Sequence, residues 1–361
     1  MNIFQATQAY ERWSARQVPF VPADLQLKHR LMAQSAFSFF RATCYRWMQV
    51  WPEVCADLAT APVLRAVADL HVENFGTWRD SDGRLIWGIN DFDEACVFPY
   101  TSDLVRLVVS AKLAGRAEHL AVKLDEACEA ILTGYREGLR AGGRPFVLSE
   151  QHTWLREIAT NSLRDPVKFW AKMEALPMVQ GTVSHDVTNA IEQVMPEANL
   201  SYGFRRRRSG LGSLGRPRFV ALAEWRGGKV AREAKRLVAS AGLWAQGQKG
   251  GGTLLYQSML EQAVRCRDPF VRMDGYWLLR RLSPYCSRIE LTALPRKRDE
   301  GKLLYAMGWE TANVHLASAP TIPAVQRDLA ARKSTWLRKA AKAMTKATLA
   351  DWNDWAEHHA G

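Results

Sequence analysis

The segment between positions 63 and 104 constrains the fold most, because short apolar strands alternate there with loops rich in acidic and amide side chains. Strands are predicted over 63–67, 75–78 and 85–89, and an Asp-Ser-Asp-Gly turn joins the last two into a hairpin. The polar residues that follow the first and third strands are Asp69, His71, Asn74, Asn90, Asp91 and Asp93. Such side chains just beyond strand ends predict a site for a hard cation with a general base beside it.

Phosphoryl transfer needs this set of side chains: an Asp that orients the attacking hydroxyl, and an Asn and an Asp that hold Mg²⁺. The pattern Asp-x-His-x-x-Asn, followed by a hairpin and Ile-x-Asp-Phe, resembles the protein-kinase-like fold, especially its aminoglycoside and choline phosphotransferase branch. This resemblance implies that Asp69 is catalytic and that Asn74 and Asp91 bind the metal. Asp93 is a further metal or network residue.

The same resemblance assigns supporting roles. In that branch an Asp-Leu pair opens the next helix and its Asp braces the catalytic loop, which here implies Asp103. His71 is assigned structural support of the same loop. Ser102 is the predicted N-cap of this helix, which is expected to run to about His119.

The sequence is similar in more detail to a bacterial family known only as domain-of-unknown-function family 2252. The family's loop and acidic segment correspond here to Ala68-Asp-Leu-His-Val-Glu-Asn74-Phe-Gly76 and Asn90-Asp-Phe-Asp-Glu94. The segments 35–41 and 308–315 also resemble it, so the similarity extends over most of the chain. Ala68 departs from the family pattern, which has Gly there. The alternative is that these acids only cap turns, but their spacing and strand context favour the functional interpretation.

A glycine-rich turn in the second half of the chain carries Gly210, Gly212, Ser213 and Gly215. Strands are predicted on both sides, and kinase-like proteins cover nucleotide phosphates with such a strand–turn–strand unit. A phosphate-pairing cation belongs on the next strand, where Lys229, Arg232 and Lys235 are candidates. Related families carry Lys-Glu-Ala at this place, which implies Arg232. Alternatively, the glycines form a flexible turn and 205–208 is a solvated run of arginines.

The fold class that these features predict is α+β, with two kinase-like lobes. The glycine turn follows the acidic loops by about 140 residues, whereas it precedes them in kinases, so the lobes would be circularly permuted. The expected regions are a helical one with the acidic loops (1–200), a β-rich one with the glycine turn (201–290) and a helical C-terminal one (291–361). Helices are expected over 28–41, 121–140, 302–316 and 325–355.

Composition narrows the class of protein. With 47% hydrophobic and 24% charged residues the chain is of ordinary globular type, and no run is apolar enough to span a membrane. The six cysteines form no metal or disulfide pattern, and the N-terminus lacks a signal peptide, so a cytoplasmic location is expected. The net charge of +12 suits anionic partners.

The predicted activity is ATP- and Mg²⁺-dependent phosphoryl transfer to an unidentified small-molecule or protein acceptor. Transfer of AMP would use the same residues. A different class of function is a catalytically silent nucleotide- or RNA-binding module. On the C-terminal helix Leu337, Ala341 and Met344 fall on one face, and Arg332, Lys339, Lys342 and Lys346 fall near the other. The simpler and favoured interpretation is a packed helix with a solvated basic face. The alternative is that this basic face binds nucleic acid.

Overall fold

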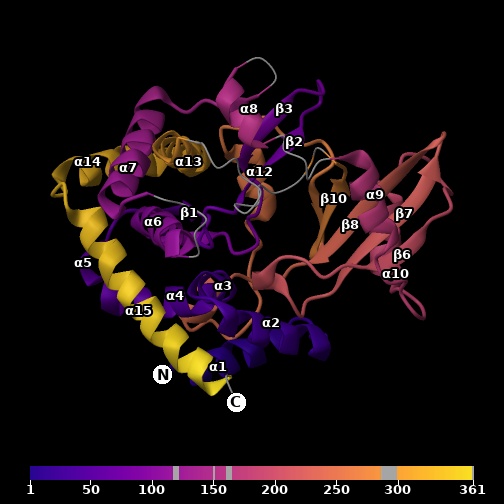
Figure 1. Cartoon of the computed structure of the whole chain (residues 1–361), viewed down its shortest axis with the longest axis horizontal. Coiled ribbons are helices and arrows are strands. Elements are labelled where there is room, and N and C mark those ends of the chain that lie inside the picture. Colours follow the sequence, from indigo (N-terminus) through magenta and orange to yellow (C-terminus); the bar gives the residue numbers. More distant parts are fainter. Residues whose placement is uncertain (117–121, 149–150, 160–164, 285, 287–298, 360–361) are drawn as a thin grey trace.

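The computed structural model describes residues 1–116, 122–148, 151–159, 165–284, 286 and 299–359. Figure 1 shows helices from both ends of the chain gathered on one side and an antiparallel sheet on the other. The sheets are small and all of their strand pairs are antiparallel among the described residues. The predicted α+β class is therefore confirmed, while the kinase-like lobes stay a prediction.

The chain begins with short helices whose ends are set by local side chains: α1 (Ile3–Ala15), α2 (Pro22–Gln34), α3 (Ala36–Ala42), α4 (Cys44–Val54) and α5 (Ala56–Ala59). Asn2 and Gln5 form a capping box at the start of α1. The helix predicted over 28–41 is interrupted at Ser35. The backbone of Ser35 is extended, and its Oγ accepts a hydrogen bond from the Ser38 N–H at 3.1 Å, which caps a new helix.

Two small sheets carry the acidic loops. Strands β1 (Val63–Ala66) and β4 (Cys96–Pro99) pair with each other, and β2 (Phe75–Arg79) and β3 (Leu85–Ile89) form a hairpin to which β5 (Phe146–Val147) adds. The three strands predicted in this segment are present, with ends within one residue of the prediction. Asp69 follows β1 and Asp91 follows β3, so both loops leave the same part of the molecule.

Long helices enclose the main hydrophobic core: α6 (Tyr100–Arg116), α7 (Leu124–Ala141), α13 (Glu300–His315), the short 3₁₀ segment η4 (Leu316–Thr321), α14 (Ile322–Ala331) and α15 (Trp336–His358). Helix α6 lies inside the group formed by α7, α13 and α15 (Figure 1). The helix predicted over 325–355 is two helices, because Arg332 leaves the helical backbone ahead of a Ser-Thr pair that favours a helix start. The predicted end of α6 near His119 lies outside the described residues.

The larger sheet holds β6 (Gly203–Arg206), β7 (Arg218–Trp225), β8 (Gly228–Arg236), β9 (Arg272–Asp274) and β10 (Trp277–Leu282) in the order β6-β7-β8-β10-β9. The glycine turn, with η2 (Leu211–Ser213), joins its first two strands. Helices α9 (Pro166–Glu174) and α10 (His185–Glu192) lie beside this sheet (Figure 1). The remaining helices are α8 (Thr153–Ala159), α11 (Ala241–Ala245) and α12 (Tyr256–Gln262).

Helices α7 and α13 approach at backbone distance. A Cβ atom added at Gly308 would lie 2.1 Å from the Ile131 carbonyl oxygen, and one added at Gly134 would lie 2.0 Å from that of Tyr305. Only glycine fits at these contacts, because such distances are far below van der Waals contact. The crossing fixes α13 against the core, and buried residues of α13 contact Asp103 and Ile89, which adjoin the two acidic loops.

We therefore expect Gly308→Ala to destabilise the protein by about 1–3 kcal/mol, as overpacked sites do, although alanine is the better helix former. Gly301→Ala on the same helix is the matched control, since its added Cβ would have its nearest neighbour at 3.4 Å. The control should be neutral or stabilising by up to about 1 kcal/mol. Denaturant unfolding of the three proteins measures both effects, and equal stability of the two variants would contradict the close crossing.

Candidate functional site

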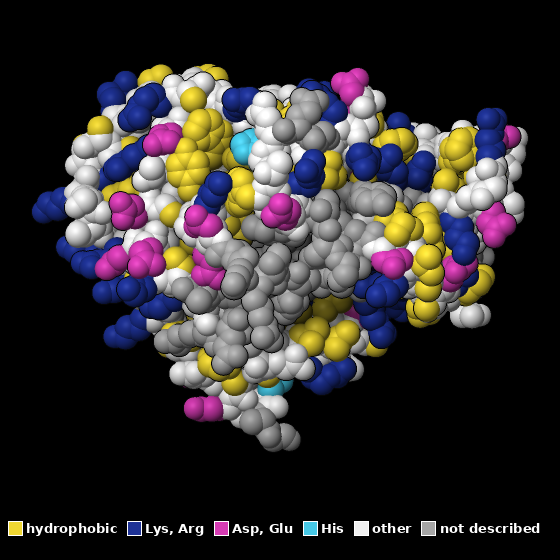
Figure 2. Space-filling model, turned by 45° about the horizontal axis from the view of Figure 1, so that its top comes forward, with side chains coloured by type: hydrophobic (Ala, Val, Ile, Leu, Met, Phe, Trp, Pro, Cys, Tyr) yellow, Lys and Arg dark blue, Asp and Glu magenta, His cyan; other side chains and the backbone are white. Residues whose placement is uncertain are grey.

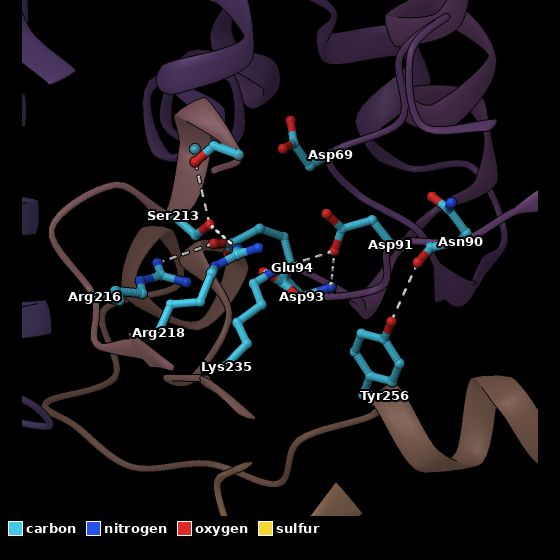
Figure 3. A network of polar contacts seen from close by, with 12 residues as sticks. Asp69, Asn90, Asp91, Asp93, Glu94, Ser213, Arg216, Arg218, Lys235 and Tyr256 are labelled. Atoms are coloured by element: carbon cyan, nitrogen blue, oxygen red, sulfur yellow. Dashed lines mark hydrogen bonds and ion pairs between the residues drawn. The ribbon is translucent and has the colours of Figure 1, made fainter. Parts of the chain in front are cut away.

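A polar pocket lies where the acidic loops, the glycine turn and helices α1 to α4 meet (Figure 3). Its empty space, counted out to the open mouth and including open solvent, is about 580 Å³. The predicted site residues that line it are Asp69, His71, Asn74, Asp91, Asp93, Gly210, Gly212 and Ser213. Two regions about 140 residues apart in sequence thus contribute to one pocket.

The Asp69 loop, residues 67–74, is held by its own backbone and side chains. The Asn74 amide nitrogen donates to the Asp69 carbonyl oxygen at 2.7 Å, and the His71 Nδ1 accepts from the Glu73 N–H at 3.2 Å. The second bond leaves the proton of the neutral His71 ring on Nε2. Ala68 has a positive φ of 68°. This is the position at which the family pattern has Gly, whose missing Cβ removes the strain of that backbone.

Asp103, in the first turn of α6, anchors the start of this loop. Its carboxylate accepts the N–H groups of Val67 and Ala68 at 2.7 and 2.9 Å. His315 Nε2 lies 2.9 Å from the same carboxylate, and Tyr135 contacts the other ring nitrogen of His315 at 2.7 Å. Asp103 and His315 are fully buried. The loop geometry thus depends on a carboxylate from α6 and an imidazole from α13.

Asp69 is paired with an arginine that sequence reasoning missed. Arg106, one turn after Asp103 on α6, contacts the Asp69 carboxylate and lies over the Phe40 ring at 4.0 Å. Burial raises the pKa of Asp69 to about 6, although the charge of Arg106 acts in the opposite direction. The spacing of Asp103 and Arg106 by three residues on one helix face was the available signal.

Asp91 and Asp93 face Lys235 at the end of β8. The Lys235 ammonium contacts the Asp93 carboxylate and lies 3.5 Å from an oxygen of Asp91 (Figure 3). Burial, followed by the charge of Asp91, raises the pKa of Asp93 above its ordinary value. Burial lowers the pKa of Lys235, and the two carboxylates oppose that shift. Two carboxylates therefore share one ammonium.

Arg232 does not reach the pocket, and strand alternation is the reason. Side chains at odd and even positions of a strand point to opposite faces, so Arg232 faces away from Lys235. The Arg232 guanidinium donates to the Val194 carbonyl oxygen at 2.7 Å and lies over Phe270. Of the three candidate cations, Lys235 contacts Asp91 and Asp93, whereas Lys229 pairs with Glu174.

The glycine turn bends at two residues with positive φ, Gly210 at 77° and Gly215 at 95°. Gly212 lies next to Asp69: a Cβ added there would be 3.6 Å from an Asp69 carboxylate oxygen. Ser213 Oγ accepts from the Arg218 guanidinium at 3.0 Å. Gly215 does not line the pocket; its carbonyl oxygen accepts from the Val21 N–H at 2.8 Å, so it attaches the turn to the start of α2.

Further pairs of charges line or support the pocket. Arg41 pairs with Glu73 at 2.5 Å, and Arg216 donates to Glu94 at 3.2 Å. Deeper in the sheet, Glu233 is fully buried and accepts from the guanidinium groups of Arg207, Arg218 and Arg280. Burial alone would raise the pKa of Glu233, but these arginines lower it well below its ordinary value.

The run of arginines at 205–208 is not simply solvated. Arg206 and Arg208 pair with Asp24 of α2, at 2.7 and 2.6 Å. Arg207 pairs with Glu233, and Arg205 donates to the Leu176 carbonyl oxygen at 2.9 Å. These contacts attach β6 to the helices on both sides of it.

On the C-terminal helix the predicted division of faces is present. Leu337, Ala341 and Met344 are buried on one side of α15, and Lys339, Lys342 and Lys346 are exposed on the other. On the face shown in Figure 2, Lys and Arg side chains are spread among Asp and Glu side chains. Binding of nucleic acid to such a surface stays a prediction.

Fold and pocket together define a mixed α+β protein with a charged pocket between helices and a sheet. Residues 17–195 match a protein family described as "Uncharacterized protein conserved in bacteria (DUF2252)". These residues, about half of the chain, belong to that family. The further similarity expected at 308–315 lies outside the matched range. No curated protein and no solved structure matches the chain.

The described residues contain no group of three or more His, Cys, Asp or Glu side chains arranged to hold a metal ion. Of the predicted metal ligands, Asn74 has an amide and so does not belong to these four residue types, and Asp91 and Asp93 contact Lys235. Across the same residues, no helix is both long and apolar enough to cross a bilayer.

Glu310 of α13 supports the second acidic loop. Its carboxylate accepts the N–H of Ile89 at 3.1 Å, two residues before Asp91, and a bond from the Asn313 amide at 2.7 Å. Gly88 leaves room for it, since a Cβ there would lie 2.2 Å from the Glu310 carboxylate. Burial raises the pKa of Glu310 to about 7, with Arg265 acting in the opposite direction.

This raised pKa predicts a specific dependence of stability on pH. The folded state binds the Glu310 proton more tightly than the unfolded state, so the contribution of Glu310 to stability is lost as pH rises from about 4.5 to about 7. Between pH 5 and pH 8 the wild-type protein should lose on the order of 2 kcal/mol of unfolding free energy relative to Glu310→Gln.

Denaturant unfolding of both proteins at the two pH values gives this double difference, from which any constant effect of the glutamine cancels. Glu129→Gln, at an exposed position of α7, is the control and should follow the wild type at both pH values. A pH-independent difference between wild type and Glu310→Gln would show that Glu310 has no raised pKa.

Proposed function

We propose that this protein is an ATP- and Mg²⁺-dependent phosphotransferase with a kinase-like, circularly permuted arrangement of its two parts. One observation carries the proposal: the loop with Asp69 and Asn74, the loop with Asp91, and the glycine turn all line the same pocket. Kinase-like phosphoryl transfer uses these elements together, and it uses a lysine on the third strand of the glycine-turn sheet. Lys235 lies on the third strand, β8, counted from the strand before the turn.

The residues present fit a divalent cation. Asp91 and Asp93 have one ammonium between them, which leaves a net negative charge in a largely buried place. The Asn74 amide belongs to the oxygen ligands that Mg²⁺ accepts. Asn74, Asp91 and Asp93 would hold the ion, which when bound supplies positive charge to the nucleotide phosphates.

The remaining residues have roles that follow from their contacts. Asp69 would accept the proton of the acceptor hydroxyl, because its raised pKa still leaves it ionised at neutral pH and able to act as a base. Arg106 fixes the orientation of its carboxylate. Lys235 and the N–H groups of the glycine turn would bind phosphate oxygens.

Transfer of AMP in place of phosphate would use the same residues, and the reaction products distinguish the two: ADP for phosphoryl transfer, diphosphate for AMP transfer. A silent nucleotide-binding module would bind ATP and release neither. A function in nucleic-acid binding predicts RNA affinity that falls steeply with salt.

The metal role of Asp91 predicts a loss of binding. Asp91→Asn should weaken Mg²⁺-dependent binding of ATP by at least about tenfold, since metal sites lose affinity by such factors when one partner is removed. Calorimetry with and without Mg²⁺ measures this. Asp82→Asn, at an exposed position of the β2–β3 turn, is the control. Equal Mg²⁺-dependent affinity in Asp91→Asn and wild type would refute the assignment.

The role of Asp69 as the base predicts a loss of turnover without a loss of binding. Asp69→Asn should bind Mg²⁺ and ATP as the wild type does but lose roughly 10²–10⁴-fold in turnover, because an amide cannot accept the proton. The fold should persist, since the amide oxygen can still accept from Arg106. Turnover is followed as release of ADP or labelling of an acceptor. Retained turnover would assign the base to another residue.

A further inference from the structure

Lys28 of α2 differs from the other cations of the pocket. It lines the pocket and is only 4% exposed, yet no acidic group of the described residues lies within ion-pair distance of its ammonium. Its one hydrogen bond goes to the Gly212 carbonyl oxygen, at 3.3 Å. By contrast, Arg41, Arg216 and Lys235 each contact a carboxylate. Lys28 therefore brings to the pocket a positive charge that forms an ion pair with no carboxylate of the described residues.

Burying an ammonium in this way costs several kcal/mol unless an anion compensates it. Burial lowers the pKa of Lys28 to about 8, opposed first by Glu11, so the group is still mostly protonated at neutral pH. Glu11 itself pairs with His29, at 2.6 Å. The charge of Lys28 is thus present at neutral pH.

The location of Lys28 separates it from the proposed metal end of the pocket. Its partner Gly212 is the residue of the glycine turn that lies beside Asp69. Lys235, the other buried lysine, lies instead against Asp91 and Asp93. Tyr10 and Tyr45 also line the pocket, and the Tyr45 ring centroid lies 5.9 Å from the Lys28 ammonium.

We infer that Lys28 binds an oxyanion, and that the acceptor of the reaction carries such a group, a phosphate or a carboxylate, beside Asp69. The acceptor part of this inference rests on the proposed function, whereas the anion site rests on the pocket alone. An acidic acceptor held by Lys28 would have its hydroxyl near the Asp69 carboxylate, because both residues lie beside Gly212.

Lys28→Met tests the anion site. Because replacement of a buried charge by an apolar side chain of similar volume is often neutral or stabilising, this variant should melt at or above the wild-type temperature in buffer without phosphate or acetate. Inorganic phosphate and sodium acetate, titrated in separate arms at constant ionic strength, should raise the wild-type melting temperature through binding to the folded state. Lys28→Met should lose at least about tenfold in affinity for whichever anion binds.

Lys342→Met is the matched control, because it removes the same charge from an exposed position, and it should bind the anion as the wild type does. Protection by phosphate alone indicates a phosphate-bearing acceptor, and protection by acetate a carboxylate-bearing one. Equal anion affinity in Lys28→Met and wild type would overturn the inference. So would a destabilised Lys28→Met, since Lys28 would then be a structural residue of the glycine turn.

The same titration in the presence of Mg²⁺ and a non-hydrolysable ATP analogue separates this site from the nucleotide site. Anion binding should persist, and Lys28→Met should bind the analogue with unchanged affinity. A tenfold loss of analogue binding in Lys28→Met would instead assign Lys28 to the nucleotide. If no nucleotide binds at all, the proposed function fails while anion binding at Lys28 is still measured.

Wild-type anion affinity should also fall as pH rises from 7 to 9. The charged or titratable groups around Lys28 are Glu11, Tyr10, Cys44, Tyr45, Asp69, Glu94 and Arg216. Burial raises the pKa of the two tyrosines and of Cys44 well above this window, and the pKa of Asp69, raised by burial to about 6, lies below it. A pH-independent affinity would contradict the role of the Lys28 ammonium.

Discussion

The Asp69 loop depends on one buried carboxylate, that of Asp103. The loop turns sharply after β1, and its residue Ala68 takes a positive φ that costs a non-glycine residue about 1–2 kcal/mol. Asp103 stabilises this turn by accepting both successive N–H groups, and His315 holds the carboxylate in place. Since His315 comes from α13, the close crossing of α7 and α13 at Gly308 and Gly134 fixes the helix that holds this carboxylate in place.

Buried charges make the second connection, between the helices and the sheet. Lys235 of β8 pairs with Asp93, and Arg216 of the glycine turn pairs with Glu94, which also accepts the Ala241 N–H at 2.6 Å. Such buried pairs add little net stability, because desolvation offsets their attraction, but removing one partner is costly. We therefore infer that they fix how the sheet sits on the acidic loops, while the apolar cores determine that each part folds.

Sequence patterns predicted local features well, because these depend on near neighbours. The hairpin, the strand–turn–strand unit and the burial of one face of α15 follow from periodicity and turn residues. Helix interruptions at Ser35 and Arg332 were missed, since a single capping side chain or backbone angle decides them. Lys235 was one of three candidates, and alternation along β8 would have separated it from Arg232 once the strand bounds were known. Arg106 was missed although its spacing from Asp103 was an available signal, and Lys28 was not identified because only tertiary contacts show what faces it.

The charges of the pocket are distributed unevenly between its two ends. One end of the pocket has more carboxylates than cations, because Asp91 and Asp93 share the ammonium of Lys235. The other end carries Lys28, whose ammonium forms an ion pair with no carboxylate of the described residues. Asp69 lies at the Lys28 end of the pocket, next to the glycine turn, and Arg106 forms an ion pair with it. A ligand that brings a divalent cation to one end and an anion to the other would neutralise both. A nucleotide–metal complex with an acidic acceptor has this charge distribution, so the electrostatics of the pocket favour a two-substrate reaction over the binding of one neutral ligand.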